Sequence, residues 1–302
     1  MKYTKPALTI PQQIQQLKQR GLLITDIAEA ERQLLNISYY RLAGYWWAMQ
    51  DDKQQHTFKP GSTFENAVSL YNFDRELRLL VFGIIERIEI GVRTRMIYQL
   101  SHEFDPWWFT DPKLFKDVSA HQRTLESIRK EIARSEDTFL VHHRQTYNTD
   151  SRLPPAWKSL EVVSLGNLSK LYGNLKSSVR SKDRIAADLK LVNQTFMPSW
   201  MQTFTQIRNI CAHHGRLWNK NLPGRPKLLP KPPAPWLTWV PPVTEHHRLY
   251  VHLCCMKYML NVIVPGNRFT QKLSGLLSKY PNIDINALGL PSSWQNEPLW
   301  QS

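Results

Sequence analysis

Two side chains five residues apart, Arg208 and His213, have the chemistry needed to cleave RNA. Arginine carries a permanent planar charge that matches phosphate oxygens, and histidine titrates near neutral pH and can take or give a proton. The imidazole would move protons while the guanidinium stabilises charge that develops at phosphorus. Because RNA carries its own nucleophile, the 2′-hydroxyl, no activated serine or metal-bound water is required. The expected products are a 2′,3′-cyclic phosphate and a 5′-hydroxyl.

A helix over roughly residues 198–214 is expected to carry this pair. Pro198 suits the first turn of a helix, where its missing N–H costs nothing, and Gly215 suits the left-handed position just past the end. Four apolar residues at helical spacing predict a buried stripe: Trp200, Phe204, Ile207 and Cys211.

The same helical spacing separates the candidate residues from the core. At about 100° per residue, Asn209 and His213 fall on the polar face and Arg208 on its flank. His214 falls back near the apolar stripe, so we expect it to be structural and His213 to be reactive. A non-catalytic alternative stays open at this point, because an arginine and a histidine at this spacing also occur by chance as solvated residues at a helix end.

Composition favours a polyanionic partner. The 302 residues hold 39 Lys and Arg against 25 Asp and Glu, a net charge of +14. No apolar stretch approaches the length of a membrane-spanning helix, and no hydrophobic signal core follows the N-terminus. We therefore expect nucleic acid rather than membrane as partner, and a cytoplasmic protein. The three cysteines do not form a disulfide framework and are expected to be reduced and buried.

Further blocks of sequence extend the pattern around Arg208–His213. Residues 208–213 match R-N-x-x-x-H, and residues 214–219 continue it as His-Gly-Arg-Leu-Trp-Asn. These blocks resemble the abortive-infection (Abi) family of AbiD/AbiF type and the HEPN-domain ribonucleases, over about residues 10–225. The additional blocks that carry the resemblance are residues 39–46 (YYRLAGYW), 58–64 (FKPGSTF), 70–78 (LYNFDRELR), 85–95 (IERIEIGVRTR) and 155–157 (PAW).

The resemblance implies an all-α protein with a HEPN-type helical bundle that cuts RNA without a metal or other cofactor, in antiphage defence or as a toxin. Only Arg208, Asn209 and His213 map onto the family's active motif. His213 would be the general acid or base, Arg208 the phosphate and transition-state stabiliser, and Asn209 would orient His213 or contact the scissile region. HEPN nucleases generally use two such motifs facing one another, so one motif per chain implies a homodimer with a composite active site. A noncoding RNA or a protein antitoxin is a further implied partner.

Helical spacing predicts the remaining elements. We expect an N-terminal helical segment over residues 1–62, a HEPN-like core over 63–220, and a Pro-rich segment with C-terminal helices packing on that core over 221–302. Eight prolines lie between Asn221 and Pro242 and predict an extended segment. This segment is either a linker or a wrap along the bundle surface near the active helix, and Trp236 and Trp239 favour docking. The last twenty residues are expected to be weakly structured. Residues 10–50 are expected to form two or three helices, including 10–20 and 29–49, and residues 63–101 one long or kinked helix with Thr63 as cap. The other predicted helices are 119–135, 155–174, 181–191, 198–214, 244–262 and 268–280.

Other chemistries have little support in the sequence. The paired histidines 142–143, 213–214 and 246–247 lack the ligand spacing of zinc motifs, so no metal site is expected. On the long helix, Glu86 and Glu89 are candidate partners of Arg208, but an ordinary ion pair between Glu89 and Arg93 is favoured. The main competing function is a non-catalytic module that binds RNA or a protein partner. A structural subunit of a defence complex is a third possibility.

Overall fold

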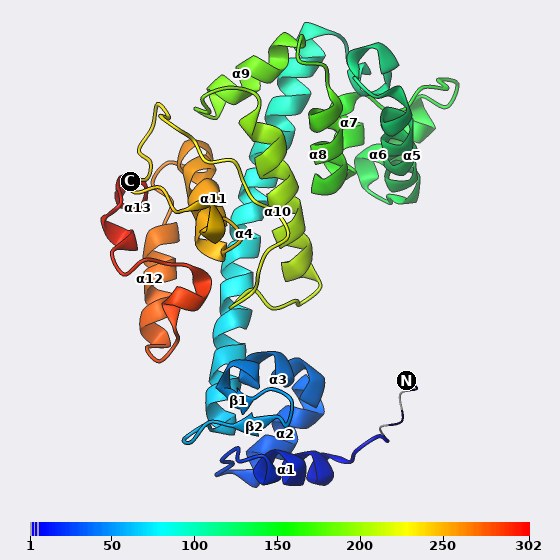
Figure 1. Cartoon of the computed structure of the whole chain (residues 1–302). Helices are drawn as coiled ribbons and strands as arrows, with labels where there is room; N and C mark the ends of the chain where they lie inside the picture. The colour runs from blue at the N-terminus through cyan, green and yellow to red at the C-terminus, as the bar shows by residue number, and fades with distance from the viewer. Residues whose placement is uncertain (1, 3, 5) are drawn as a thin grey trace. The chain divides into compact units, whose positions relative to one another are not determined.

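The computed structural model describes residues 2, 4 and 6–302, and the protein is mostly helical (Figure 1). The prediction of an all-α protein is therefore confirmed. The described chain divides into two compact units, residues 1–78 with 274–283 and residues 79–273 with 284–302. The helices are α1 (Ile10–Gln19), α2 (Ile27–Ile37), α3 (Tyr39–Trp46), α4 (Phe64–Glu103), α5 (Val118–Arg134), α6 (Thr138–Thr146), α7 (Ala156–Ser159), α8 (Leu165–Asn174), α9 (Arg180–Asp188), α10 (Phe196–Ala212), α11 (Leu249–Ile263), α12 (Phe269–Lys279) and α13 (Pro298–Gln301).

The first unit packs α1, α2 and α3 around the beginning of α4. Trp46 is the central ring of its core and lies edge-on to Tyr39 and Phe58. Between α3 and α4 the chain forms a short antiparallel hairpin of β1 (Gln50–Asp52) and β2 (Thr57–Phe58). Thr63 caps α4 as predicted, because its hydroxyl accepts a hydrogen bond of 3.1 Å from the Asn66 amide.

A buried polar network joins α3 to α4 in this unit. The Tyr45 hydroxyl donates to Asp74 at 2.7 Å, and Arg78 forms an ion pair with Asp74 and a 3.2 Å hydrogen bond with the Tyr45 oxygen. All three side chains are buried. Each buried polar group therefore has a partner, which offsets the cost of removing it from water.

One predicted helix of the first unit is wrong in extent. The sequence predicted a single helix over 29–49, whereas the chain breaks between α2 and α3 at Ser38, whose φ is 76°. The Ser38 hydroxyl accepts from the Arg41 amide and so begins α3. A local side-chain cap replaces the helical continuation that spacing alone predicted.

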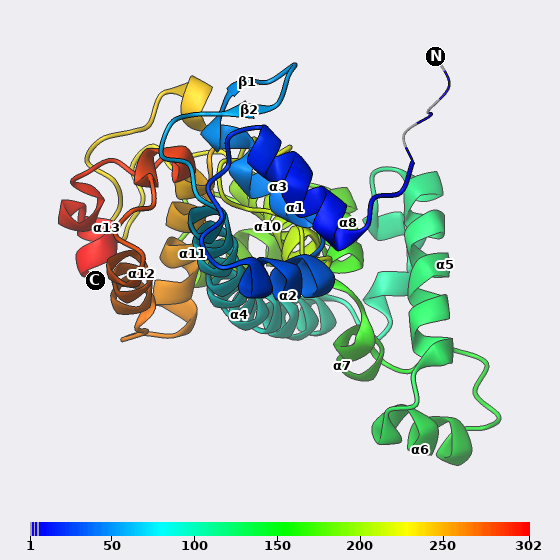
Figure 2. The same cartoon turned by 90° about the horizontal axis from the view of Figure 1, so that it is seen from below.

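The second unit is built on the remainder of α4, with α8 and α10 packed side by side (Figure 1). Figure 2 shows α5 and α6 at one edge of this unit. Helix α11 approaches α4 closely at Gly91, where an added Cβ would lie 2.8 Å from Ile263. Glycine is needed there because two helix surfaces meet without room for a side chain.

The predicted helix over 155–174 is also divided. Helix α7 ends at Ser159, a 3₁₀ turn follows over Leu160–Val162, and α8 begins at Leu165. Arg93 donates a hydrogen bond of 2.9 Å to the Val163 carbonyl, and the Ser164 amide donates to Glu131 at 3.1 Å. Side chains from α4 and α5 thus satisfy backbone groups that the break leaves free, a tertiary effect that helical spacing cannot reveal. Helix α6 was not predicted.

The Pro-rich segment contains no helix, as predicted, and part of it lies along α10. Trp236 is buried and stacks on Trp200 at 6.2 Å between ring centroids, with Tyr258 edge-on to both rings. Trp236 thus docks the segment as predicted, but Trp239 is half exposed and does not. We name residues 222–231 the strap, because this stretch is tied to α10 by the contacts described below.

The prediction of weak structure for the last twenty residues is wrong. Trp294, Leu299 and Trp300 are buried, and the two indoles meet edge-on at 4.9 Å. Helix α13 packs on α11. These large apolar side chains provide the burial that short, Pro- and Ser-containing local sequence does not indicate.

Candidate active site

Helix α10 carries the three predicted site residues. Its apolar stripe is buried as predicted, and each member is at most 6% exposed: Trp200, Phe204, Ile207 and Cys211. The helix begins at Phe196, two residues before Pro198, which lies in its first turn. Burial of this stripe fixes the rotation of the helix and so determines which side chains face outward.

The end of α10 differs from the prediction. Gly215 was expected in the left-handed conformation, but His214 has it, with φ 56°. The Gly215 amide donates to the Ile210 carbonyl at 2.7 Å, and the His214 amide donates to Cys211 at 3.1 Å. This pair of hydrogen bonds is a Schellman motif, one residue earlier than the sequence predicted. Glycine is needed at position 215 for a different reason: the backbone there packs against Ile210, and an added Cβ would lie 3.1 Å from the Ile210 side chain.

Asn209 and His213 are both exposed, one helical turn apart on the polar face of α10, in agreement with the prediction from spacing. His213 is the cap residue of the helix, and its amide donates to the Asn209 carbonyl at 3.0 Å. His214 is also exposed, so the expectation that it falls near the apolar stripe is wrong, because the helix ends before it.

Arg208 lies on the flank and is partly buried. Its guanidinium carbon is 5.8 Å from the centroid of the Phe82 ring on α4, within the range of a cation–π contact. Its Nε is buried and has no hydrogen-bond partner. A buried N–H of this kind costs free energy until a partner arrives, and an anion beside α10 could supply that partner.

Glu86 and Glu89 on α4 were the candidate partners of Arg208. Glu89 forms a 2.7 Å ion pair with Arg93, and both side chains are largely buried. Within the described part of the chain, neither Glu86 nor Glu89 forms an ion pair with Arg208. The ion pair that the sequence favoured is confirmed.

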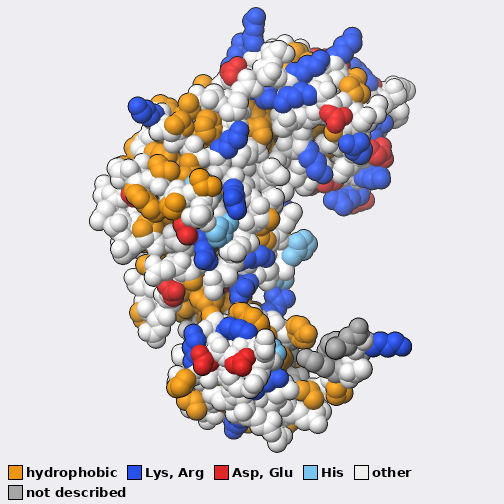
Figure 3. Space-filling model, viewed as in Figure 1, with side chains coloured by type: hydrophobic (Ala, Val, Ile, Leu, Met, Phe, Trp, Pro, Cys, Tyr) orange, Lys and Arg blue, Asp and Glu red, His pale blue; other side chains and the backbone are white. Residues whose placement is uncertain are grey.

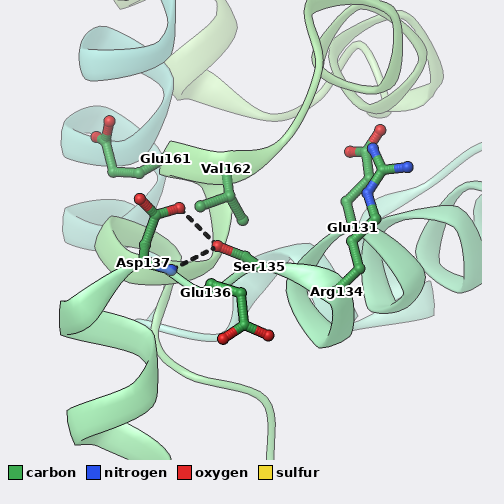
Figure 4. A pocket seen from close by; sticks show the side chains of 7 residues that line it. All are labelled: Glu131, Arg134, Ser135, Glu136, Asp137, Glu161 and Val162. Atoms are coloured by element: carbon green, nitrogen blue, oxygen red, sulfur yellow. Dashed lines mark hydrogen bonds between the residues drawn. The ribbon is translucent and has the colours of Figure 1, made fainter.

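One hollow of the second unit lies away from the motif. Its volume is about 580 Å³, and its lining carries four carboxylates and one guanidinium (Figure 4). Ser135 bridges its floor by donating to Asp137 at 2.5 Å. So many carboxylates repel phosphate, and the hollow therefore suits no polyanion. Its lining residues are Glu131, Arg134, Ser135, Glu136, Asp137, Glu161 and Val162.

The stretch of sequence around the motif is more basic than the chain as a whole, which the overall composition does not reveal. Residues 189–244 contain seven Lys and Arg and no Asp or Glu. Figure 3 shows Lys, Arg and His side chains gathered over α10 and the segment that follows it. Four basic residues of this run are exposed, and sequence reasoning did not single them out: Lys190, Arg225, Lys227 and Lys231. An unbroken run without carboxylates could have identified them.

The comparison with protein families places this arrangement in a known group. Residues 32–219 match the family described as Abi-like protein. The chain belongs to the Abi-like family. The match includes Arg208, Asn209 and His213, and the family points to a role in abortive infection or related defence. Comparisons with curated proteins and with solved structures found no match.

Three further findings concern the described part of this Abi-like protein. No described helix is both long enough and apolar enough to cross a membrane. Residues 2, 4 and 6–302 contain no group of three or more His, Cys, Asp or Glu side chains arranged to hold a metal ion. The three cysteines are buried and form no disulfide, as expected.

Proposed function

We infer that this Abi-like protein is an endoribonuclease of HEPN type, related to the AbiD/AbiF proteins, acting in antiphage defence or as a toxin. Its reaction would be attack of an RNA 2′-hydroxyl on the adjacent phosphorus, which gives a 2′,3′-cyclic phosphate and a 5′-hydroxyl without a metal ion. The observation that carries this proposal is the grouping at the end of α10. Asn209 and His213 face solvent there, and Arg208 lies beside them with an unpaired, buried Nε.

Each side chain has a role that follows from its position. His213 is exposed and can reach a ribose hydroxyl or a leaving oxygen as general base or acid. Arg208 rests on Phe82, which restricts its motion and prepares its remaining N–H groups for phosphate oxygens. Asn209, one turn before His213, can orient the imidazole or bind the backbone near the scissile bond.

A second copy of the chain would complete the site. Leu79, Phe82 and Ile90 are exposed on one side of α4 at helical spacing, and they are 61%, 37% and 48% exposed. Phe82 is also the ring beneath Arg208, so a partner that covered this stripe would lie next to the motif. A two-fold axis here would bring two motifs to one RNA. A homodimer with a composite site is therefore part of the proposal, as is an RNA or protein antitoxin that restrains it.

A non-catalytic RNA-binding or protein-interaction module in a defence complex is the second candidate. The acid-free run of residues 189–244 favours RNA binding whether or not cleavage occurs. The two functions differ in what His213 does, because binding by surface charge does not need a neutral imidazole that exchanges protons.

Cleavage of total cellular RNA in EDTA tests the proposal, with wild type, His213→Ala and His214→Ala compared. His214→Ala is the matched control because it removes an exposed imidazole one residue away. We expect wild type and His214→Ala to cut RNA to cyclic-phosphate ends and His213→Ala to leave it intact. Equal cutting by His213→Ala would reject the assignment. RNA binding by wild type without any cutting would favour the second candidate.

A further inference from the structure

The strap is fixed to one side of α10 by three contacts. Gly224 lies so close to the helix that an added Cβ would be 2.5 Å from Gln206 Oε1. The Lys227 amide donates to Ser199 Oγ at 3.0 Å, and the Lys227 carbonyl accepts from Trp200 Nε1 at 2.7 Å. Gly224 thus lies beside Thr203 and Gln206, and Lys227 beside Ser199 and Trp200. The strap therefore runs antiparallel to the helix.

This path leads to the motif. Ser199, Gln206 and His213 are seven residues apart in turn, so they lie on nearly one line along the helix surface. At 1.5 Å per residue, Gln206 is about 10 Å and Ser199 about 20 Å from His213 along that line. The three residue steps from Gly224 to Lys227 cover about 10 Å when extended, enough to follow α10 from Gln206 back to Ser199, which are about 10 Å apart along the helix axis.

The outer side of the strap carries positive charge. Arg225, Lys227 and Lys231 are exposed, whereas the side chains that anchor the strap are buried: Leu222, Pro226 and Leu229. None of the three cations forms an ion pair with any residue the structure describes. Prolines and hydrogen bonds hold the backbone, so these charges are spaced in advance and little ordering is needed on binding.

An aromatic ring is exposed farther along the same segment. Trp239 is 50% exposed, whereas Trp236, three residues before it, is 7% exposed and packed on Trp200. Exposed rings on a basic surface stack on unpaired bases, whichever base is present. In a duplex the bases are already stacked on one another, so a ring of this kind selects single strands.

We propose that the strap is a binding track for single-stranded RNA that leads the strand to His213. Arg225, Lys227 and Lys231 contact successive phosphates, and Trp239 stacks on a base. The track deepens the proposed function, on which it rests for the reaction at its end. RNA binding and RNA cleavage are measured separately, so failure of one does not imply failure of the other.

The test is a binding titration of a labelled 20-nucleotide polyuridine against proteins that all carry His213→Ala, which keeps the probe intact. The strap variant is Arg225→Gln, Lys227→Gln, Lys231→Gln. Its matched control is Lys113→Gln, Arg129→Gln, Lys130→Gln, which removes one Arg and two Lys that are exposed on other parts of the same unit. Thermal unfolding of both variants verifies that they fold.

Each phosphate contact to a single strand contributes a slope of about 0.7 in log affinity against log salt, or about fivefold at 0.1 M salt. The strap variant should therefore lose about 100-fold in affinity, and its salt slope should fall by about 2. The control variant should lose less than about threefold. Equal losses in the two variants would show that only overall charge matters and would overturn the track.

Two more probes test the base-stacking part of the proposal. Trp239→Ala should weaken polyuridine binding about tenfold and leave binding of inorganic polyphosphate unchanged. A 20-base-pair RNA duplex should bind the wild-type strap no better than it binds the strap variant. Equal strap dependence for duplex and single strand, or an equal effect of Trp239→Ala on both polyanions, would refute single-strand selection.

Discussion

The left-handed residue at the end of α10 can be tested by replacing His214 with two different residues. His214 has φ 56°, and a side chain with a Cβ pays about 1 to 2 kcal/mol in this region. Glycine has no such cost, but its greater conformational entropy stabilises the unfolded chain by about 0.4 to 1 kcal/mol relative to alanine. His214→Gly should therefore be more stable than His214→Ala by about 0.8 kcal/mol.

The comparison of these two variants isolates the backbone. Both lose the imidazole and every contact that it makes, and they differ only in the Cβ. A difference of about 0.8 kcal/mol corresponds to about 2 °C in melting temperature for a chain of this size, and to a measurable shift in the urea midpoint. Cleavage should persist in both variants, because the bond from the His213 amide to Asn209 does not involve the His214 side chain.

Urea unfolding followed by tryptophan fluorescence, together with RNA cleavage, gives both readouts. An alanine variant as stable as the glycine variant would show that residue 214 is not left-handed in solution. Loss of cleavage in His214→Gly, with the fold intact, would assign the proton transfer to His214 instead of His213.

Four further outcomes are expected. Arg208→Lys should lower the cleavage rate about 100-fold or more in single-turnover kinetics, because an ammonium cannot reproduce the guanidinium fork; unchanged rates would exclude phosphate stabilisation by Arg208. Burial lowers the pKa of His252 from its ordinary 6.5 to about 4, against the two backbone carbonyls that raise it. The unfolded chain binds this proton first, so as pH falls from 6.5 to 4 stability should drop by about 3 kcal/mol, and His252→Gln should lose less over the same range in urea titrations. Gly224→Ala should cost about 1 to 3 kcal/mol of unfolding free energy through its clash with Thr203 and Gln206, whereas Gly83→Ala, which meets no atom within 4 Å, should stabilise α4 slightly. Ile90→Asp should make the protein monomeric in sedimentation and inactive, while Leu35→Asp, at a more exposed position of the first unit, should do neither.

Helical periodicity predicted the motif helix well because one long apolar stripe determines it. Trp200, Phe204, Ile207 and Cys211 are all buried, and the outward direction of Asn209 and His213 follows from them. The helix end was less predictable, since Gly215 could serve either a left-handed backbone or a close contact. The contact with Ile210 decides between these, and it exists only in three dimensions.

Breaks within predicted helices have a similar cause. The sequence around Val163 continues the helical pattern, but Arg93 and Glu131 bind the exposed backbone groups from other helices. Partners distant in sequence leave no local trace, so spacing cannot reveal them. For the Pro-rich segment, the proline content predicted an extended chain, with wrapping near the active helix as one alternative, but it did not predict the line along α10 that the strap follows.

The central claim is that an RNA 2′-hydroxyl attacks phosphorus with His213 and Arg208 as the catalytic groups. The most direct measurement maps one cleavage position and then replaces that nucleotide with its 2′-deoxy form in an otherwise identical RNA. In EDTA, wild type should cut the all-ribose strand to a cyclic phosphate and leave the deoxy-substituted strand intact at that position, and His213→Ala should cut neither. Cleavage of the deoxy-substituted strand at the same bond would contradict the mechanism.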